Sequence, residues 1–196
     1  MSRFHEVRFL GSAAAAGQFP ADVGAEVAFA GRSNAGKSSA INAIAGRSGL
    51  ARASKTPGRT RLLNFFELAA ERRLVDLPGY GYASAPAAER QAWLPLIEAL
   101  RARVSLAGWF VIVDCRRGIT SGDEGLLAWA DARQRVHVLL AKADKLSRAQ
   151  GRAALRGASQ RLGDRATAQL FSATEGTGVE EAQETLGAWL GIPGRK

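Results

Sequence analysis

The sequence predicts an α/β domain with a mostly parallel six-stranded sheet, one antiparallel hairpin at its edge, and helices on both faces. Apolar runs of strand length alternate with segments of helical periodicity, a pattern typical of a parallel sheet covered on both faces. The apolar runs 62–69 and 73–77 follow each other too closely for a crossover connection, so they should form a hairpin. A Gly-rich segment, 31–38, separates the first strand candidate from the first helix candidate.

Each strand is expected where a short apolar run is bounded by turn residues or charges. The strands are expected at 26–30, 62–69, 73–77, 109–115, 136–141 and 167–171. Residues 1–24 are expected to form a short extension of a single domain spanning 1–196, and 46–61 a long polar loop. Loops of that length are usually functional or mobile.

Each helix is expected where apolar residues recur with helical spacing. The helices are expected at 37–45, 86–104, 121–133, 147–162 and 178–190. In the last helix, Val179, Ala182 and Leu186 lie near one face, and Glu180 and Glu181 in the first turn complement the helix dipole.

The composition excludes several classes of protein. No apolar run approaches the ~20 residues of a membrane helix, and the N-terminal segment lacks a signal-peptide layout. Cys115 is the one cysteine, so no intrachain disulfide forms, and with two histidines the chain cannot build a Cys/His zinc cluster. We expect a cytoplasmic monomer.

The chain is strongly basic, with a net charge of +9 and a pI near 10.7. Five basic residues and no acid lie in 46–61, and five arginines with one acid lie in 147–165. This clustering favours an RNA or ribosomal partner. The alternative is an arginine bias without a binding role, since 22 of the 27 basic residues are arginine.

The segment Gly31–Ser38 matches the phosphate-binding pattern G-x-x-x-x-G-K-[ST] between a strand and a helix. In that context, successive N–H groups point at an anion at the helix N-terminus. Lys37 is expected to reach the β- and γ-phosphates, and the Ser38 hydroxyl to bind Mg²⁺.

The segment Asp76-Leu77-Pro78-Gly79 ends the third expected strand. We expect Asp76 to hold Mg²⁺ through water, and the Gly79 N–H to approach the γ-phosphate. In the basic loop, Thr60 is expected to complete the Mg²⁺ coordination and to report whether the γ-phosphate is present. An incidental Pro-Gly turn is the alternative for that loop.

The segment Ala141-Lys142-Ala143-Asp144 resembles the base-recognition motif [NT]-K-x-D of GTPases. The Asp144 carboxylate would accept two hydrogen bonds from guanine, a pattern that adenine lacks. In Phe171-Ser172-Ala173, the Ala173 N–H would contact guanine O6. Ala141 lacks the usual polar side chain, and one lost neutral hydrogen bond is worth about 0.5–1.5 kcal/mol, so affinity rather than specificity should weaken.

The motifs GRSNAGKSS, TPGRT, LLNFFEL and DLPGYGYA together resemble the EngB family (YihA/YsxC) of translation-factor-like GTPases, from about Val7 onward. The resemblance implies a bacterial P-loop GTPase with a Ras-like fold that binds GTP or GDP and Mg²⁺. It also implies a role in assembly of the large ribosomal subunit, with rRNA and ribosomal proteins as partners, and necessity for normal cell division and septation.

By the family pattern, the residues with catalytic roles are Lys37, Thr60 and Gly79, and those at the metal are Ser38, Thr60 and Asp76 through water. The expected nucleotide-binding residues are Gly31, Arg32, Ser33, Asn34, Ala35, Gly36, Lys37, Ser38, Gly58, Arg59, Thr60, Arg61, Leu62, Asp76, Leu77, Pro78, Gly79, Ala141, Lys142, Ala143, Asp144, Phe171, Ser172 and Ala173.

Tyr80 follows Gly79 where Ras-like enzymes commonly place a water-orienting Gln. We therefore expect slow intrinsic hydrolysis that an external group accelerates. Related GTPases with Asn at the position of Asn34 use it in binding K⁺, which suggests K⁺-stimulated turnover. Two other functions stay open: an ATP-dependent phosphotransferase, and a nucleotide-gated scaffold at the division site without RNA contact.

Overall fold

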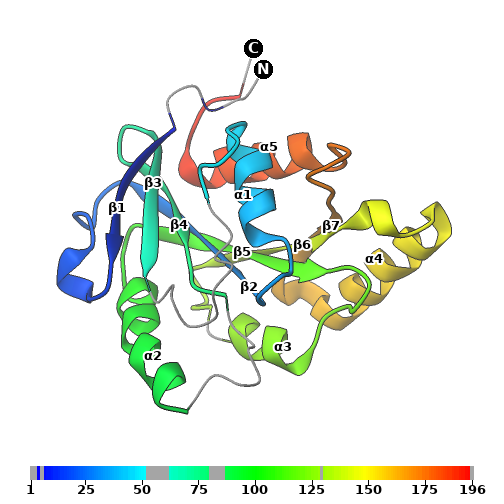
Figure 1. The fold of residues 1–196 in the computed structure, drawn as a ribbon, viewed down its shortest axis with the longest axis horizontal. Helices are drawn as coiled ribbons and strands as arrows, with labels where there is room; N and C mark the ends of the chain where they lie inside the picture. The colour runs from blue at the N-terminus through cyan, green and yellow to red at the C-terminus, as the bar shows by residue number, and fades with distance from the viewer. Residues whose placement is uncertain (1–3, 5–6, 52–61, 80–86, 129, 195–196) are drawn as a thin grey trace.

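A computed structural model describes residues 4, 7–51, 62–79, 87–128 and 130–194, which form one twisted sheet flanked by helices (Figure 1). The strands are β1 (Arg8–Ala13), β2 (Ala25–Gly31), β3 (Leu63–Ala69), β4 (Arg72–Asp76), β5 (Leu106–Asp114), β6 (Arg135–Ala141) and β7 (Thr167–Leu170). The α-helices are α1 (Lys37–Ala45), α2 (Ala87–Arg101), α3 (Ser121–Leu127), α4 (Arg148–Leu162) and α5 (Val179–Leu190). None of the helices within these described ranges combines the length and apolar character that crossing a bilayer requires.

The sheet has the order β1-β3-β4-β2-β5-β6-β7. The strands from β4 to β7 in this order run parallel, whereas β1 and β4 both run antiparallel to β3. The expected hairpin of β3 and β4 is confirmed. In a parallel sheet the carboxyl ends of neighbouring strands meet at one edge, and the connections that follow β2, β4, β5 and β6 therefore converge there.

The expectation of six strands was wrong, because segment 1–24 contributes a seventh strand rather than a simple extension. β1 occupies the edge of the sheet, so the hairpin lies one strand further in. The strand has no alternating apolar pattern: Phe9 and Leu10 are both exposed, and the register shifts between Phe9 and Gly11. Periodicity could not reveal a strand whose position is set by pairing with β3.

Helices cover both faces of the sheet, as the sequence predicts (Figure 1). On one face, Ile41 of α1 and Leu186 of α5 pack in a buried cluster with Phe29 of β2. On the other, residues of α2, α3 and α4 pack in a second cluster with alternate residues of the same strands, such as Leu162 and Val111. The central strands are buried on both sides, so they read as continuous apolar runs.

Two helices end earlier than their periodicity predicts, and in each case a side chain captures backbone groups. α2 stops at Arg101 rather than at 104; the Asp22 carboxylate accepts from the N–H of Val104 at 3.1 Å and of Ser105 at 2.9 Å. α3 stops at Leu127 rather than at 133, and the Gln134 side chain accepts from the N–H of Asp131 at 3.1 Å. Such side-chain bonds compete with helix continuation.

A buried charge network fixes the start of β2. The Glu26 carboxylate is fully buried and accepts from Arg73 at 2.9 Å and from Arg103 at 2.7 Å. Both arginine side chains are more than nine-tenths buried. Removing one member of such a network leaves the remaining charges uncompensated inside the protein.

We predict that Glu26→Gln lowers the free energy of unfolding by about 3–5 kcal/mol, because two buried guanidinium groups lose their counter-charge. Urea denaturation monitored by circular dichroism measures this loss. The matched control is Glu98→Gln, which removes a carboxylate that is 55% exposed and paired with Arg101, itself 39% exposed. This control should change stability by about 0–1 kcal/mol. Equal losses in the two variants would show that the buried network has no special role.

Candidate functional site

The phosphate loop, residues 31–38, connects β2 to α1 at the carboxyl edge of the sheet. β2 ends at Gly31 and α1 begins at Lys37. Two left-handed residues turn the loop back on itself: Asn34 has φ 63° and Gly36, the helix N-cap, has φ 109°. Asparagine tolerates this region better than most side chains, and glycine adopts it freely. The first N–H groups of α1 have no acceptor within the helix, which is the arrangement that the predicted phosphate site requires.

Lys37 and Asp76 form an ion pair, although they come from different segments of the chain. Lys37 is the first residue of α1, and Asp76 is the last residue of β4, which pairs with β2. Their side chains are 12% and 7% exposed, so both charges lie inside the site. The structure thus brings together the two residues expected at the phosphates and at the metal.

Gly79 lies directly against the phosphate loop. A Cβ at this position would stand 2.8 Å from Ser33 Oγ and 3.2 Å from Ser33 Cα, and the latter is backbone that cannot move aside easily. The Ser33 hydroxyl also reaches the Gly79 carbonyl at 3.5 Å. A side chain at this position would press on the loop, so the close approach favours glycine, and the segment Asp76–Gly79 lies beside the phosphate loop.

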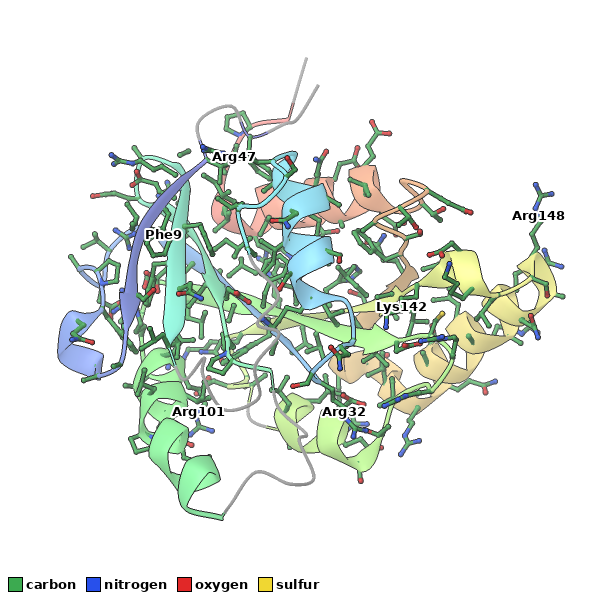
Figure 2. All side chains as sticks on the ribbon, in the orientation of Figure 1. Phe9, Arg32, Arg47, Arg101, Lys142 and Arg148 are labelled. Carbon is green, nitrogen blue, oxygen red and sulfur yellow. The ribbon has the colours of Figure 1, made fainter. Side chains whose placement is uncertain are left out.

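The base loop, residues 141–145, follows β6 and is tied to the phosphate loop by Lys142. Lys142 has φ 63°, and its Nζ donates to the carbonyl of Asn34 at 2.6 Å. Figure 2 shows the Lys142 side chain beside the phosphate loop. The stem of this lysine therefore bridges the two loops, and the two parts of the predicted nucleotide site have a fixed separation.

Asp144 and Ser172, both expected near the base, lie in contact with each other. The Ser172 hydroxyl donates to Asp144 Oδ1 at 2.7 Å, and Lys145 Nζ lies 2.9 Å from Oδ2. Lys145, and then the Ser172 hydroxyl, lower the pKa of the Asp144 carboxyl. The N–H of Ala143 donates to the carbonyl of Phe171 at 3.0 Å. The carboxylate is thus held ionised and oriented, the form that accepts hydrogen bonds.

Ala141 ends β6 inside the protein and faces the phosphate loop. It is 3% exposed, and a Cβ at Gly36 would lie 3.6 Å from its Cβ. The polar side chain expected here in the motif would therefore lie against the phosphate loop. In this chain a methyl group fills that place, and Lys142 supplies the polar contact between the two loops.

Asp114, which belongs to none of the sequence motifs, supports Lys142. It ends β5, next to β6, and its Oδ2 lies 3.0 Å from Lys142 Nζ and 2.6 Å from an Arg116 nitrogen. The Arg116 guanidinium, and with it Lys142, holds the pKa of the Asp114 carboxyl well below its usual range. The signal available in the sequence was a carboxylate at the carboxyl end of a central parallel strand.

A cavity of about 280 Å³ lies between the phosphate loop, the end of β5 and α3. Arg32 and Asn34 line it from the phosphate loop, with Asp114, Arg116 and Lys142 on the opposite side. The Asp114–Lys142 pair therefore forms part of a cavity wall and is accessible from it.

Several predicted residues lie outside the described part of the chain, namely Gly58, Arg59, Thr60 and Arg61. Leu62, half-buried, precedes β3, and Leu77 is buried beside the more exposed Pro78. Ser38 is the second residue of α1. The described residues contain no group of three or more His, Cys, Asp or Glu side chains able to hold a metal. A serine hydroxyl and one carboxylate fit Mg²⁺, which binds few protein oxygens and keeps several waters or phosphate oxygens.

Comparison with known proteins finds GTP-binding proteins, both by family and among individual relatives. Residues 26–142 match a family described as 50S ribosome-binding GTPase. The chain is 50% identical to the probable GTP-binding protein EngB of Nitrosococcus oceani, over 98% of this chain and 99% of the relative. It is 49% identical to the protein of the same description from Methylococcus capsulatus, over 95% and 92% of the two chains.

The fold is similar to solved structures. A crystal structure of a probable GTP-binding protein EngB aligns with a TM-score of 0.65 at 21% identity, over 86% of this chain and all of that one. The structure of Era with MgGDPNP and a segment of 16S ribosomal RNA aligns with a TM-score of 0.63 at 21% identity, over 88% of this chain and 58% of that one. At these identities the structural likeness concerns the fold.

We predict that Asp114→Asn weakens GDP binding about tenfold. A hydrogen bond between charged groups contributes about 1.5–3 kcal/mol, and tenfold corresponds to about 1.4 kcal/mol. The low end applies because the Lys142 side chain is 31% exposed and keeps its bond to Asn34. Titration calorimetry with GDP measures the change.

A double-mutant cycle shows whether Asp114 acts through Lys142. Asp114→Asn should add nothing to Lys142→Met, because the lysine is then absent. The control is Asp131→Asn, which removes a carboxylate from an exposed pair with Arg133 and should leave GDP binding unchanged. Additive losses in the double variant would show that Asp114 acts by another route.

Proposed function

The chain belongs to the EngB family of GTP-binding proteins, and from this premise we propose that it is a Mg²⁺-dependent GTPase switch in assembly of the large ribosomal subunit. In this proposal its action is necessary for normal cell division and septation. The partner is the precursor of the large subunit, with its rRNA and ribosomal proteins, and the protein works in the bacterial cytoplasm.

The observation that carries the nucleotide part of the proposal is the bond from Lys142 to the Asn34 carbonyl at 2.6 Å. It sets the separation between a loop suited to phosphates and a carboxylate suited to a base. A mononucleotide carries a base and phosphates in one covalent molecule, so a preorganised pair of loops favours that class of ligand over phosphate or base alone.

The base loop favours guanine over adenine. The ionised Asp144 carboxylate offers two acceptor oxygens, which match the N1–H and 2-amino donors of guanine. Adenine has neither donor at these positions, and a site with buried polar groups rejects an analogue that leaves them unpaired. This argues against the ATP-dependent phosphotransferase. The methyl group of Ala141 removes one polar contact near the phosphate loop and is expected to lower affinity moderately.

In hydrolysis the side chains bind and orient the triphosphate. Lys37 carries the positive charge that offsets charge on the β- and γ-phosphates, and the Gly79 N–H is a donor on the γ-phosphate side. Ser38, Asp76 through water, and Thr60 would hold Mg²⁺, which neutralises phosphate charge when bound. Tyr80 takes the place of a water-orienting side chain, so intrinsic turnover is slow. The ribosomal particle, or K⁺ held near Asn34, is proposed to accelerate it.

A ribosomal partner is supported by the net charge of +9 and by the description of the matching family as ribosome-binding. The competing function is a nucleotide-gated scaffold at the division site without RNA contact. Co-sedimentation with bacterial 50S subunits in GTP and in GDP separates them. A switch binds more strongly with GTP, and its binding weakens as salt rises.

We predict micromolar or tighter binding of GTP and GDP in titration calorimetry, and binding of ATP at least about a hundredfold weaker. Lys37→Ala should abolish detectable nucleotide binding, because the phosphates lose their cation. Asp144→Asn should reduce the preference for GTP over ATP more than it lowers the melting temperature. Tight ATP binding, or unchanged selectivity in Asp144→Asn, would overturn the assignment.

We predict faster GTP hydrolysis in KCl than in NaCl at equal ionic strength and Mg²⁺, by on the order of tenfold, since added positive charge is effective in this chemistry. Phosphate release under single-turnover conditions measures the rates. Asn34→Ala should remove the difference between the two salts while retaining GDP binding. Equal rates for the wild-type protein in both salts would exclude a K⁺ role.

A further inference from the structure

Helix α4 carries a row of three arginines on its exposed side. Arg148, Arg152 and Arg156 are each four residues apart, so they lie one above the other on the same side of the helix. All three are exposed. We call them the α4 arginine row. Within the described residues, no hydrogen bond or ion pair involves their side chains. Figure 2 shows Arg148 projecting from α4 at one end of the molecule.

The other two arginines of this segment have structural partners. Arg161 Nε donates to the Glu124 carboxylate of α3 at 2.7 Å. Arg165 donates to the carbonyl oxygens of Arg161 at 2.9 Å and of Leu162 at 3.3 Å, where α4 ends. A cation at a helix C-terminus is favourable for the helix. The five arginines therefore divide into two that stabilise the fold and three that do not.

The α4 arginine row is unfavourable for the stability of helix α4 itself. Arg148 is its first residue, and the first turn contains no acidic residue. Positive charge near a helix N-terminus is unfavourable, and so are like charges at a spacing of four residues. The helix is instead fixed by the capping box of Ser147 and Gln150, and by burial of Ala158 and Leu162. The stability of helix α4 therefore does not explain why these three positions carry arginine.

We propose that the α4 arginine row binds the phosphate backbone of RNA when the protein docks on a ribosomal particle. This inference rests on the proposed ribosomal function and adds the surface that makes the contact. Successive arginines are about 6 Å apart along the helix axis, so the row presents regularly spaced cations to a chain of phosphates. The planar guanidinium group suits bidentate binding of phosphate.

The rest of the exposed face favours RNA over other anionic partners. The other exposed residues from 149 to 160 on α4 are small or polar, namely Ala149, Gln150, Ala153, Gly157, Ser159 and Gln160. They supply no apolar or aromatic anchor of the kind that protein interfaces use. The apolar side of α4 packs toward β7, so it does not provide the surface that an interfacial membrane helix needs. An exposed cationic face without such anchors matches phosphate-backbone contacts.

The test compares two triple variants of the full-length protein. The first is Arg148→Gln with Arg152→Gln and Arg156→Gln, which keeps good helix formers in place. The control is Arg101→Gln with Arg133→Gln and Arg135→Gln, three residues that lie outside α4; Figure 2 shows Arg101 on α2, at the far side of the molecule from Arg148. Both lower the net charge by three from +9. Binding to purified bacterial 50S subunits and to a short synthetic RNA duplex is measured across salt concentrations.

We expect the variant of the α4 arginine row to lose on the order of tenfold or more in affinity for both probes. Its plot of log affinity against log salt should be shallower by about two to three units, because each phosphate contact contributes about 0.9. GDP affinity should be unchanged, and the melting temperature should equal or exceed that of the wild type because unfavourable charges are removed. The control variant should lose much less affinity and slope.

The other outcomes are distinguishable. Wild-type protein that binds neither probe would reject the ribosomal function itself. Wild-type binding with equal losses in the two triple variants would show a net-charge effect and overturn the assignment of this surface. Loss of 50S binding with retained duplex binding would identify a ribosomal protein as the partner and overturn the RNA assignment. Unchanged binding in the α4 variant would overturn the inference directly.

Discussion

The bond between the Lys142 side chain and the Asn34 carbonyl is the contact on which the candidate site depends. Without it, the phosphate loop and the base loop would be two separate turns at the ends of separate strands. The parallel sheet brings these ends to one edge, but only a side chain can fix the distance between them. Asp114 holds the lysine from the other side. The order of the parallel strands therefore brings the two loops to one edge of the sheet, and Lys142 then sets the separation between them.

Much of the fold could be predicted from the sequence because the central strands are buried on both faces and read as continuous apolar runs. The hairpin was predicted from the short connection between β3 and β4. β1 could not be predicted, because Phe9 and Leu10 are exposed and its position depends on pairing with β3. The ends of α2 and α3 could not be predicted either, since they depend on side-chain bonds to backbone N–H groups: Asp22 binds those of Val104 and Ser105, and Gln134 binds that of Asp131.

The same holds for the candidate site: residues in local motifs could be predicted from the sequence, and residues whose role depends on contacts between strands could not. The phosphate loop and the base loop have local motifs, and the pairing of Lys37 with Asp76 agrees with their expected neighbourhood. Asp114 has no motif of its own, and its role is apparent only where β5 and β6 lie side by side. Ala141 illustrates the reverse case: the sequence marks a missing polar group, and the structure shows which neighbouring side chain bridges the two loops.

The two edges of the sheet bear on self-association. An exposed strand edge is a template on which a second copy can pair, and proteins avoid this by shortening or distorting edge strands. β7 has only four residues, and β1 is interrupted by its register shift and carries the charged pair of Arg8 with Glu67. Neither edge offers a long regular ladder. A chain with such edges can present its basic surfaces to a large anionic assembly at high local concentration without polymerising through its own sheet.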